Sequence, residues 1–314
     1  MRIVVALGGN ALLKRGEAMT AAAQRANIAV AAQALAALVA AGHQITLTHG
    51  NGPQVGLIAL QAAAGPKDGA YPLDILGAES EGMVGYLIEQ ELRRALPAGT
   101  QFATLLTQVR VDPADPAFAH PSKPIGPVYD EATAQCLAKE KGWVCAKDGD
   151  VWRRVVASPE PLEILELQAV RLLVDAGLVV ICAGGGGVPV VARDGGGYAG
   201  VEAVIDKDRA TALLAIALQA DLLLLLTDMD GVYLHFGTPE AMRIRSAGTQ
   251  SLSPDIFAAG SMRPKVAAAI RFAEGAAGPA AIGRLEDALA LVQGTAGTLV
   301  IKGAAPCVTT DTSR

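Results

Sequence analysis

The sequence predicts an α/β protein: a three-layer αβα sandwich with a mainly parallel open sheet and a small inserted lid subdomain. Short apolar runs alternate with long Ala- and Leu-rich stretches of helical composition, which is typical of strands joined by crossover helices. The first of these runs, residues 3–7, is apolar at every position, as in a strand buried on both faces of a sheet. The lid is predicted because residues 112–161 break the alternation and are rich in proline and charge.

The first elements follow one another closely. Residues 3–7 are a continuous apolar run that stops at two glycines, so they predict a buried strand. Residues 20–41 are helix formers without proline, and Gly42 follows where a helix C-cap belongs. Residues 44–48 predict a second strand, which runs directly into the Gly- and Pro-containing turn at residues 50–53.

The alternation continues along the rest of the chain. Residues 179–182 predict a third buried strand, which ends in four consecutive glycines at residues 184–187. The other expected elements are helices at residues 79–96, 162–176, 206–219 and 264–276, and strands at residues 102–111, 222–226 and 298–301. The tail, residues 303–314, is polar and is expected to be loosely held.

The predicted lid lies within the first of two lobes. We divide the chain into residues 1–180, which include the insertion at about 112–161, and residues 181–314. The insertion contains both tryptophans, Trp143 and Trp152, and shows no clear sheet pattern. A plain surface excursion is the alternative, because long insertions cost little free energy.

Composition limits the class of protein and of partner. The chain has 314 residues, of which 51% are hydrophobic, 18% charged and 4% aromatic, so it can bury a large aliphatic core. Its net charge of −5 argues against nucleic acid or an anionic membrane as the main partner, and it is compatible with a small anionic ligand. The most apolar later stretch, residues 213–226, is interrupted by Gln219 and Asp221 and is too short for a membrane span.

Cysteine usage and the N-terminus bear on localisation. The four cysteines have no CxxC spacing and are too few for a disulfide scaffold, so a reducing compartment is expected. The apolar run at residues 3–7 is too short for the core of a signal peptide. We therefore expect a cytoplasmic protein.

Glycines gather where the first three buried strands end. The clusters are Gly8 and Gly9 followed by Asn10, then Gly50, Asn51 and Gly52, and then residues 184–187. In a doubly wound sheet, ligands bind beyond the carboxyl ends of the strands. Backbone N–H groups without side chains suit an anion, and a following helix adds its positive dipole. The alternative for each single loop is that glycine only permits a tight turn.

Several common site motifs are absent or incomplete. No Gly-Lys dipeptide occurs, which argues against the P-loop of Walker-type nucleotide hydrolases. Gly50, Gly52 and Gly56 only approximate the dinucleotide fingerprint, so an oxidoreductase is a distant alternative. The four histidines have no metal-ligand spacing, and no fixed protein metal site is expected.

Three lysines stand at turns or helix starts. Lys123 is followed by Pro124 and preceded by Pro121, so prolines stiffen the segment that presents its charge. Lys207 and Lys265 each lie at the start of an expected helix. For any one of them alone, a solvated surface lysine is the simpler interpretation.

Taken together, these loops and lysines resemble the carbamate kinase family within the amino acid kinase superfamily. The similar segments are residues 5–11, 49–56, 123–127, 184–190, 204–208 and 260–265, and their order and spacing agree from about residue 2 to residue 302. Residues 226–233 also resemble the strand and turn of the superfamily's nucleotide site.

The resemblance implies a reaction and its partners. It implies reversible phosphoryl transfer between ATP and carbamate, giving ADP and carbamoyl phosphate, often run toward ATP in the catabolism of arginine or related nitrogen compounds. ATP or ADP with Mg²⁺ and a homodimer are implied as well. Residues 1–180 would bind carbamate and the migrating phosphoryl group, and residues 181–314 would bind the nucleotide.

The resemblance also implies roles for individual residues. The substrate loops would be Gly8, Gly9, Asn10, Gly50, Asn51 and Gly52. The catalytic group would be Lys123, Lys207, Asp208 and Lys265. The nucleotide would contact Lys207, Thr227, Asp228, Tyr233, Met262 and Lys265. Many superfamily members carry a lysine where this chain has Ala6, and the lid lysine, Lys123, is the natural substitute.

Two alternatives are left open by the sequence. One is a superfamily kinase that acts on another small carboxylate. The other is a protein that binds carbamoyl phosphate or nucleotide without turnover. The joint presence of Lys123, Lys207, Asp208 and Lys265 argues against a loss of activity.

Overall fold

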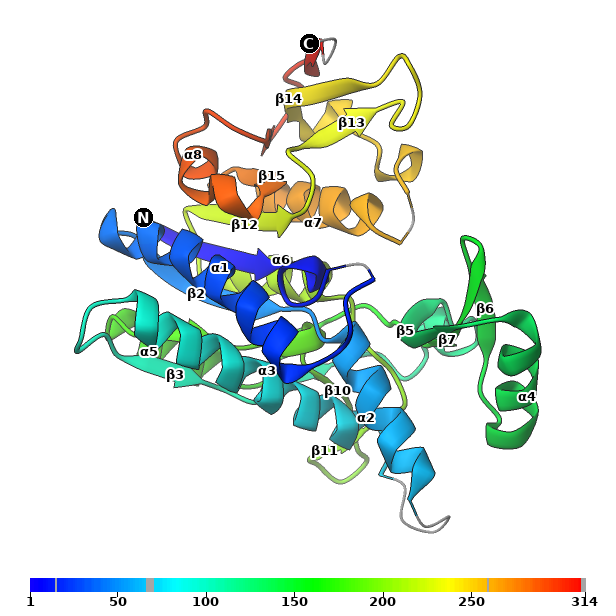
Figure 1. The fold of residues 1–314 in the computed structure, drawn as a ribbon. Coiled ribbons are helices and arrows are strands. Elements are labelled where there is room, and N and C mark those ends of the chain that lie inside the picture. Colours follow the sequence, from blue (N-terminus) through cyan, green and yellow to red (C-terminus); the bar gives the residue numbers. More distant parts are fainter. Residues whose placement is uncertain (15, 66–70, 259, 312–314) are drawn as a thin grey trace.

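A central sheet with a mostly parallel core organises the molecule (Figure 1). The computed structural model describes residues 1–14, 16–65, 71–258 and 260–311. Within them the sheet has ten strands in the order β13-β14-β16-β15-β12-β1-β2-β9-β3, with β17 paired to β14. The bounds are β1 Arg2–Leu7, β2 Gln44–His49, β3 Phe102–Thr104, β9 Val179–Ile181, β12 Leu222–Thr227, β13 Val232–Leu234, β14 Met242–Gly248, β15 Ala280–Arg284, β16 Thr298–Ile301 and β17 Val308–Asp311. The six strands from β15 to β3 are parallel to one another, whereas β16 pairs antiparallel with β15.

Helices cover both faces of this sheet, which confirms the predicted sandwich (Figure 1). The side chains of β1 alternate: Val4 and Ala6 belong to one apolar cluster, whereas Ile3, Val5 and Leu7 belong to the other. The first cluster is completed by α5 (Leu167–Asp175), α6 (Lys207–Ala217) and α7 (Met262–Gly275). The second is completed by α1 (Ala21–Ala40), α3 (Leu73–Ala95) and α8 (Ala288–Val292).

Helix α1 begins where the sequence predicts. Thr20 is its N-cap, and the hydroxyl of Thr20 accepts a hydrogen bond from the N–H of Ala23 at 3.2 Å. Among the described helices, α1 alone is long and apolar enough to cross a membrane. Its side chains Ile28, Leu35 and Leu38 are buried in the second apolar cluster, so α1 packs as a core helix.

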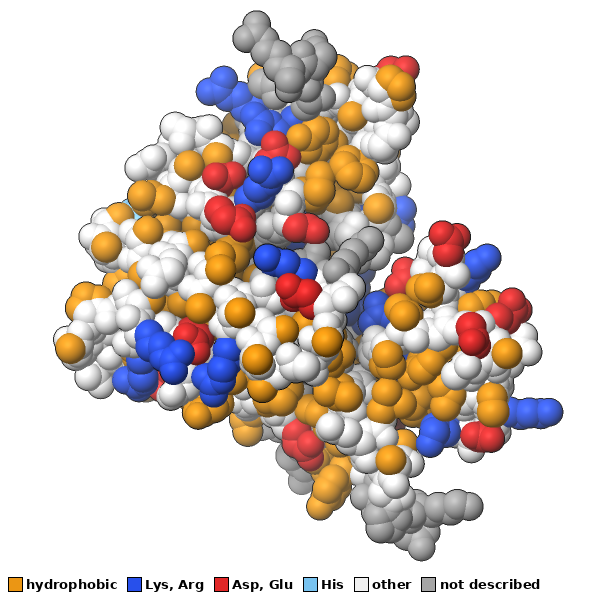
Figure 2. Space-filling view, in the orientation of Figure 1, with side chains coloured by type: hydrophobic (Ala, Val, Ile, Leu, Met, Phe, Trp, Pro, Cys, Tyr) orange, Lys and Arg blue, Asp and Glu red, His pale blue; other side chains and the backbone are white. Residues whose placement is uncertain are grey.

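The lid is a separate three-stranded sheet with one helix. It consists of β5 (Lys123–Tyr129), α4 (Glu131–Lys141), β6 (Cys145–Asp148) and β7 (Val151–Val156), and β7 pairs with both other strands. These elements lie within the predicted insertion. Figure 2 shows them as a lobe beside the main body, with a hollow between the upper part of the lid and the body.

The lid touches the body where two backbones meet. Gly56 lies on α2 (Gly52–Ala64), and a Cβ added to it would lie 1.8 Å from the Cα of Gly126 on β5. Gly126 has φ +73°, which glycine adopts without strain. Only glycines therefore allow this contact between α2 and β5.

One predicted strand is wrong in an informative way. Residues 102–111 do not form one strand: β3 belongs to the central sheet, whereas β4 (Gln108–Arg110) belongs to a second sheet. That sheet has the order β11-β10-β4-β8, with bounds β8 Glu163–Ile164, β10 Val188–Ala192 and β11 Tyr198–Gly200. Between β3 and β4, the N–H of Thr107 donates to the side chain of Glu81 and not to a neighbouring strand.

Other differences have local causes. The helix expected at 162–176 begins only at Leu167, because residues 163–164 pair with β4 as strand β8. The turn expected at 50–53 opens helix α2, in which Pro53 occupies the first turn, a position that proline tolerates. Helix α3 begins at Leu73, before the expected residue 79, after Pro72 as N-cap.

The tail was also predicted wrongly in part. Residues 308–311 form β17, which pairs antiparallel with β14 and is therefore held by backbone hydrogen bonds; residues 312–314 lie outside the described residues. The remaining predicted elements are confirmed to within about two residues at each end.

Candidate active site

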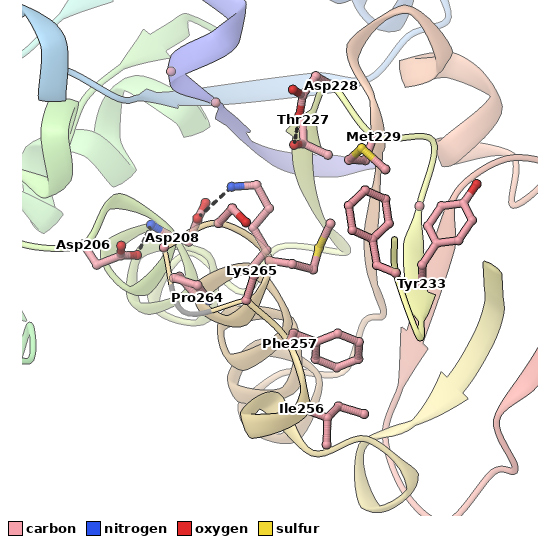
Figure 3. A pocket seen from close by; sticks show the side chains of 18 of the residues that line it. Asp206, Asp208, Thr227, Asp228, Met229, Tyr233, Ile256, Phe257, Pro264 and Lys265 are labelled. Carbon is pink, nitrogen blue, oxygen red and sulfur yellow. Dashed lines mark hydrogen bonds and ion pairs between the residues drawn. The ribbon is translucent and has the colours of Figure 1, made fainter. Parts of the chain in front are cut away.

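The candidate site is a cavity of about 800 Å³ at the carboxyl ends of β1 and β12. Three separate parts of the chain supply its polar end: the lid carries Lys123, the start of α6 carries Lys207 and Asp208, and the start of α7 carries Lys265. Figure 3 shows Asp206, Asp208 and Lys265 gathered on one side of this cavity. The three predicted lysines thus come together.

Asp208 is the centre of the lysine cluster. Its carboxylate accepts hydrogen bonds from the ammonium groups of Lys207 and of Lys265, the latter at 3.1 Å. Burial acts to raise the pKa of Asp208, but the two ammonium groups outweigh it and hold this pKa well below its usual range. The residue is therefore a carboxylate that positions two lysines and not a proton acceptor.

The two lysines differ although they share one carboxylate. Burial lowers the pKa of Lys207 to about 8, and the nearby ammonium group of Lys265 acts in the same direction. Burial also acts to lower the pKa of Lys265, yet the carboxylates of Asp208, Asp206 and Asp228 together raise it. Lys265 thus stays an ammonium group throughout the neutral range, whereas Lys207 is close to its titration point.

Lys123 meets a residue that the sequence analysis did not single out. The ammonium group of Lys123 lies 2.5 Å from Oδ2 of Asp206, a contact between the lid and the loop before α6. Oδ1 of Asp206 accepts from the N–H groups of Asp208 and Arg209, so Asp206 is the N-cap of α6. The helix was expected to begin at Asp206 itself, and an aspartate at a helix start is the N-cap signal that could have identified it.

The burial of Asp206 shows how strong that contact is electrostatically. Burial acts to raise the pKa of Asp206, but the ammonium groups of Lys123 and Lys207 together outweigh it and lower this pKa. Asp206 therefore carries a negative charge that pairs with the lid lysine.

The first two glycine loops lie beside this cluster. Gly8 and Gly9 line the cavity, and a Cβ on Gly8 would lie 2.9 Å from the carbonyl oxygen of Leu226. A Cβ on Gly50 would lie 3.4 Å from the backbone nitrogen of Gly9 and 3.5 Å from Cδ of Lys207. The loops after β1 and β2 are thus packed against each other and against Lys207.

The other predicted substrate residues lie farther back. Asn51 is buried and donates from Nδ2 to the hydroxyl of Ser80 at 2.7 Å. Gly52 opens α2, and a Cβ there would meet nothing within 4 Å. Asn10 lies in a short 3₁₀ turn, and its side chain is outside the described part of the chain. Within that part, the cavity lining does not include Gly50, Asn51 or Gly52.

The third glycine loop makes a hydrogen bond to a side chain of the protein itself. The N–H of Gly184 donates to a carboxyl oxygen of Glu81 at 2.8 Å, and the N–H groups of Gly186 and Gly187 donate to backbone carbonyls. The expectation that residues 184–187 offer their N–H groups to a ligand is therefore wrong for these three. The next strand, β10, and the buried side chain of Glu81 were not visible in the sequence pattern.

The far end of the cavity is apolar and aromatic. Tyr233 and Met262, two predicted nucleotide residues, line it together with Phe236, Ile256 and Phe257, which the sequence analysis missed. Figure 3 labels Tyr233, Ile256 and Phe257 in this part of the cavity. The ring centroids of Tyr233 and Phe236 are 5.9 Å apart. Phe236 remains 69% exposed, so an apolar wall faces the open side of the cavity, where a flat ring could be covered.

Two further predicted nucleotide residues join the two ends of the cavity. Thr227 is the last residue of β12 and Asp228 follows it; both line the cavity, and the hydroxyl of Thr227 donates to Asp228 at 3.1 Å. Across residues 1–14, 16–65, 71–258 and 260–311, no three His, Cys, Asp or Glu side chains are grouped as in a metal site. A polar end with three lysines and an aromatic end suit a nucleotide with its phosphates at the lysines.

The comparisons with known proteins identify the family. The sequence matches the model of the amino acid kinase family over residues 1–284. Carbamate kinase from Rhizobium meliloti (strain 1021) is 55% identical over 302 residues, 96% of this chain and 93% of that protein. Carbamate kinase from Haemophilus influenzae is 51% identical over 302 residues, which are 96% of this chain and 97% of that protein.

A solved structure agrees with the sequence comparisons. Carbamate kinase from Giardia lamblia bound to AMP-PNP has a TM-score of 0.86 and 39% identity, with 96% of this chain and 98% of that chain covered. The chain therefore belongs to the amino acid kinase family and, within it, to the carbamate kinases.

Proposed function

We propose that this protein transfers a phosphoryl group reversibly between ATP and carbamate, giving ADP and carbamoyl phosphate. The relatives named carbamate kinase, at 55% and 51% identity over almost the whole chain, support the proposal. The observation that carries it is the convergence of Lys123, Lys207 and Lys265 from three separate segments on one end of a nucleotide-sized cavity.

The nucleotide side of the reaction falls to the C-terminal half of the chain. Phosphoryl transfer asks the protein to align donor and acceptor and to offset the charge on the oxygens of the transferred group. In this proposal Lys207 and Lys265 bind phosphate oxygens, while Asp208 holds both ammonium groups in place. Tyr233 and Met262 contact the base, and Thr227 and Asp228 lie between base and phosphates.

The carbamate side falls to the loops after β1 and β2. Backbone N–H groups of these loops hold carbamate and the phosphoryl group, and Lys123 closes the site from the lid. The proposed loop residues are Gly8, Gly9, Asn10, Gly50, Asn51 and Gly52. The attacking oxygen of carbamate is already anionic, so no general base is needed. His49 is no candidate for one, because burial lowers its pKa to about 4 and its ring donates to the carbonyl of Gly50.

Mg²⁺ is proposed to accompany the nucleotide. Asp208 is bonded to two lysines, and Asp206 is bonded to Lys123 and to the first turn of α6. Their oxygens are therefore largely occupied, and the phosphates of the nucleotide supply most of the ligands. When bound, the ion offsets the charge on those phosphates.

The remaining parts of the proposal concern assembly and setting. We propose a homodimer, because α3 exposes Ile75, Met83 and Tyr86 along its length, with exposed fractions of 40%, 36% and 54%. Light scattering after gel filtration tests this: a mass of one chain would refute it. We also propose a cytoplasmic enzyme that makes ATP in the catabolism of arginine or a related nitrogen compound.

One assay tests the reaction and separates it from the alternatives. Purified protein is mixed with ADP, Mg²⁺ and carbamoyl phosphate, and ATP is measured with luciferase. ATP formation supports the proposal, and acetyl phosphate as a parallel donor tests a kinase for another carboxylate. Thermal stabilisation by carbamoyl phosphate or ADP without any ATP would instead indicate a binding protein.

A further inference from the structure

Glu81 is a buried carboxyl group that the proposed chemistry does not use. It lies in the middle of α3 and is 1% exposed. Its two oxygens accept hydrogen bonds from two backbone N–H groups, that of Gly184 at 2.8 Å and that of Thr107 at 3.2 Å. These two groups follow β9 and β3, so one side chain holds the ends of two neighbouring strands.

Keeping a carboxyl group at this place is costly in free energy. Burial raises the pKa of Glu81 to about 8, although the N–H groups of Thr107 and Gly184 act in the opposite direction. The two backbone N–H donors offset only part of the cost of burying this polar group. Each of these hydrogen bonds ties one loop to α3.

The loop that Glu81 holds has almost no freedom to move. A Cβ on Gly184 would lie 2.4 Å from the ring of His49, and one on Gly185 would lie 2.1 Å from Nδ2 of Asn51. A Cβ on Gly186 would lie 2.7 Å from the carbonyl oxygen of Ile205. The glycine loop is thus packed between His49 and Asn51 on one side and Ile205 on the other.

Ser80, the residue before Glu81 on α3, contacts the loop after β2. The hydroxyl of Ser80 accepts from Nδ2 of Asn51 and donates to the carbonyl of Gly77, both at 2.7 Å. Ser80 and Glu81 therefore fix, from one turn of one helix, the loop after β2 and the loop after β9. A shift of either loop would displace Asn51 on one side and the segment that leads to Asp206 on the other.

We propose that Glu81 and Ser80 are positioning residues for the carbamoyl-phosphate end of the site. They act through the glycine loop and Asn51 and do not touch substrate themselves. This inference rests on the proposed function. It assigns to α3 the task of holding the backbone donors of the carbamate side, whereas Asp208 holds the ammonium groups of the nucleotide side.

The test replaces Glu81→Gln, which keeps the shape of the side chain and turns one acceptor into a donor that faces a backbone N–H. The Michaelis constant for carbamoyl phosphate is expected to rise about tenfold or more, since a small misplacement of a binding loop has effects of this size. The Michaelis constant for ADP is expected to rise less, because Glu81 reaches Lys207 and Asp208 only through Ile205 and Asp206. Glu79→Gln is the matched control, because Glu79 lies on the same helix and is exposed.

Ser80→Ala provides a second, smaller perturbation if Glu81→Gln folds poorly. It should also raise the Michaelis constant for carbamoyl phosphate and leave that for ADP unchanged. Hydrogen exchange gives a readout without substrate: the backbone of residues 183–187 should exchange faster in Glu81→Gln than in Glu79→Gln. An active wild type whose variants show equal changes for both substrates, or none, overturns this inference, whereas an inactive wild type overturns the proposed function on which it rests.

Discussion

Removal of the lid lysine tests the proposed reaction most directly. Lys123→Ala deletes the ammonium group that lies 2.5 Å from Asp206 and lines the cavity. A single preorganised group that stabilises developing charge contributes about 10² to 10³ in kcat. We therefore expect kcat for ATP formation to fall by about 10² or more.

The fold should tolerate this change. The side chain of Lys123 is 29% exposed, and the buried carboxylate of Asp206 keeps its hydrogen bonds from the N–H groups of Asp208 and Arg209 when the ammonium group is removed. The lid is anchored by apolar contacts of Ile125 and Val156 with Val55 and Val204, which the substitution leaves in place. The free energy of unfolding should thus change little while the rate falls greatly.

The assay follows ATP from ADP and carbamoyl phosphate under saturating conditions, together with thermal unfolding of both proteins. Lys147→Ala is the matched control, because Lys147 is an exposed lysine of the same subdomain. A variant at position 123 whose kcat stays within about threefold of wild type would show that Lys123 does not act on the transferred group. A large loss of thermal stability would instead show that the ion pair holds the fold.

Three further predictions concern the nucleotide side, the lid contact and pH. Lys265→Ala should raise the Michaelis constant for ADP about tenfold or more and change that for carbamoyl phosphate little. Initial rates at varied concentrations of each substrate measure both constants, and equal changes in the two would contradict the placement of Lys265 on the nucleotide side. Gly56→Ala places a Cβ 1.8 Å from the Cα of Gly126 and should lower kcat by displacing the lid. Gly82→Ala is the control, because a Cβ there meets nothing within 4 Å, and its kcat should not change. Equal kcat values for the two variants would refute the role of this contact. Because the pKa of Lys207 is lowered to about 8, the charged form that binds phosphate is lost as pH rises through 8, so kcat/KM for ADP should fall from about pH 8 upward, and a flat profile to pH 9.5 would contradict it.

Local sequence patterns were sufficient for most of the sandwich. The strand β1 and the helix α1 were predicted from their own residues. A strand buried on both faces is a continuous apolar run, and a helix of strong helix formers is bounded by capping residues. The three lysines were identified in the same way, by position at turns and helix starts and by a resemblance to a family.

Patterns failed where a distant partner decided the local structure. Residues 102–111 look like one strand, but β3 and β4 belong to different sheets, and between them the N–H of Thr107 donates to the carboxyl group of Glu81. Helix α2 was missed because its glycine and proline read as a turn. The aromatic wall of the cavity was missed because Phe236, Ile256 and Phe257 come from segments with no periodic pattern.

The sequence by itself determined which segments are buried, where helices begin and which side chains can carry positive charge, since these depend on neighbours within a few residues. Only the tertiary structure decided how the charges are paired. Lys123 meets Asp206 across 83 positions and Gly184 meets Glu81 across 103, and such pairs follow from strand order and the docking of the lid. The physical reason is that a side chain's ionisation and hydrogen bonds depend on what surrounds it in space, and only the packed fold brings those surroundings together.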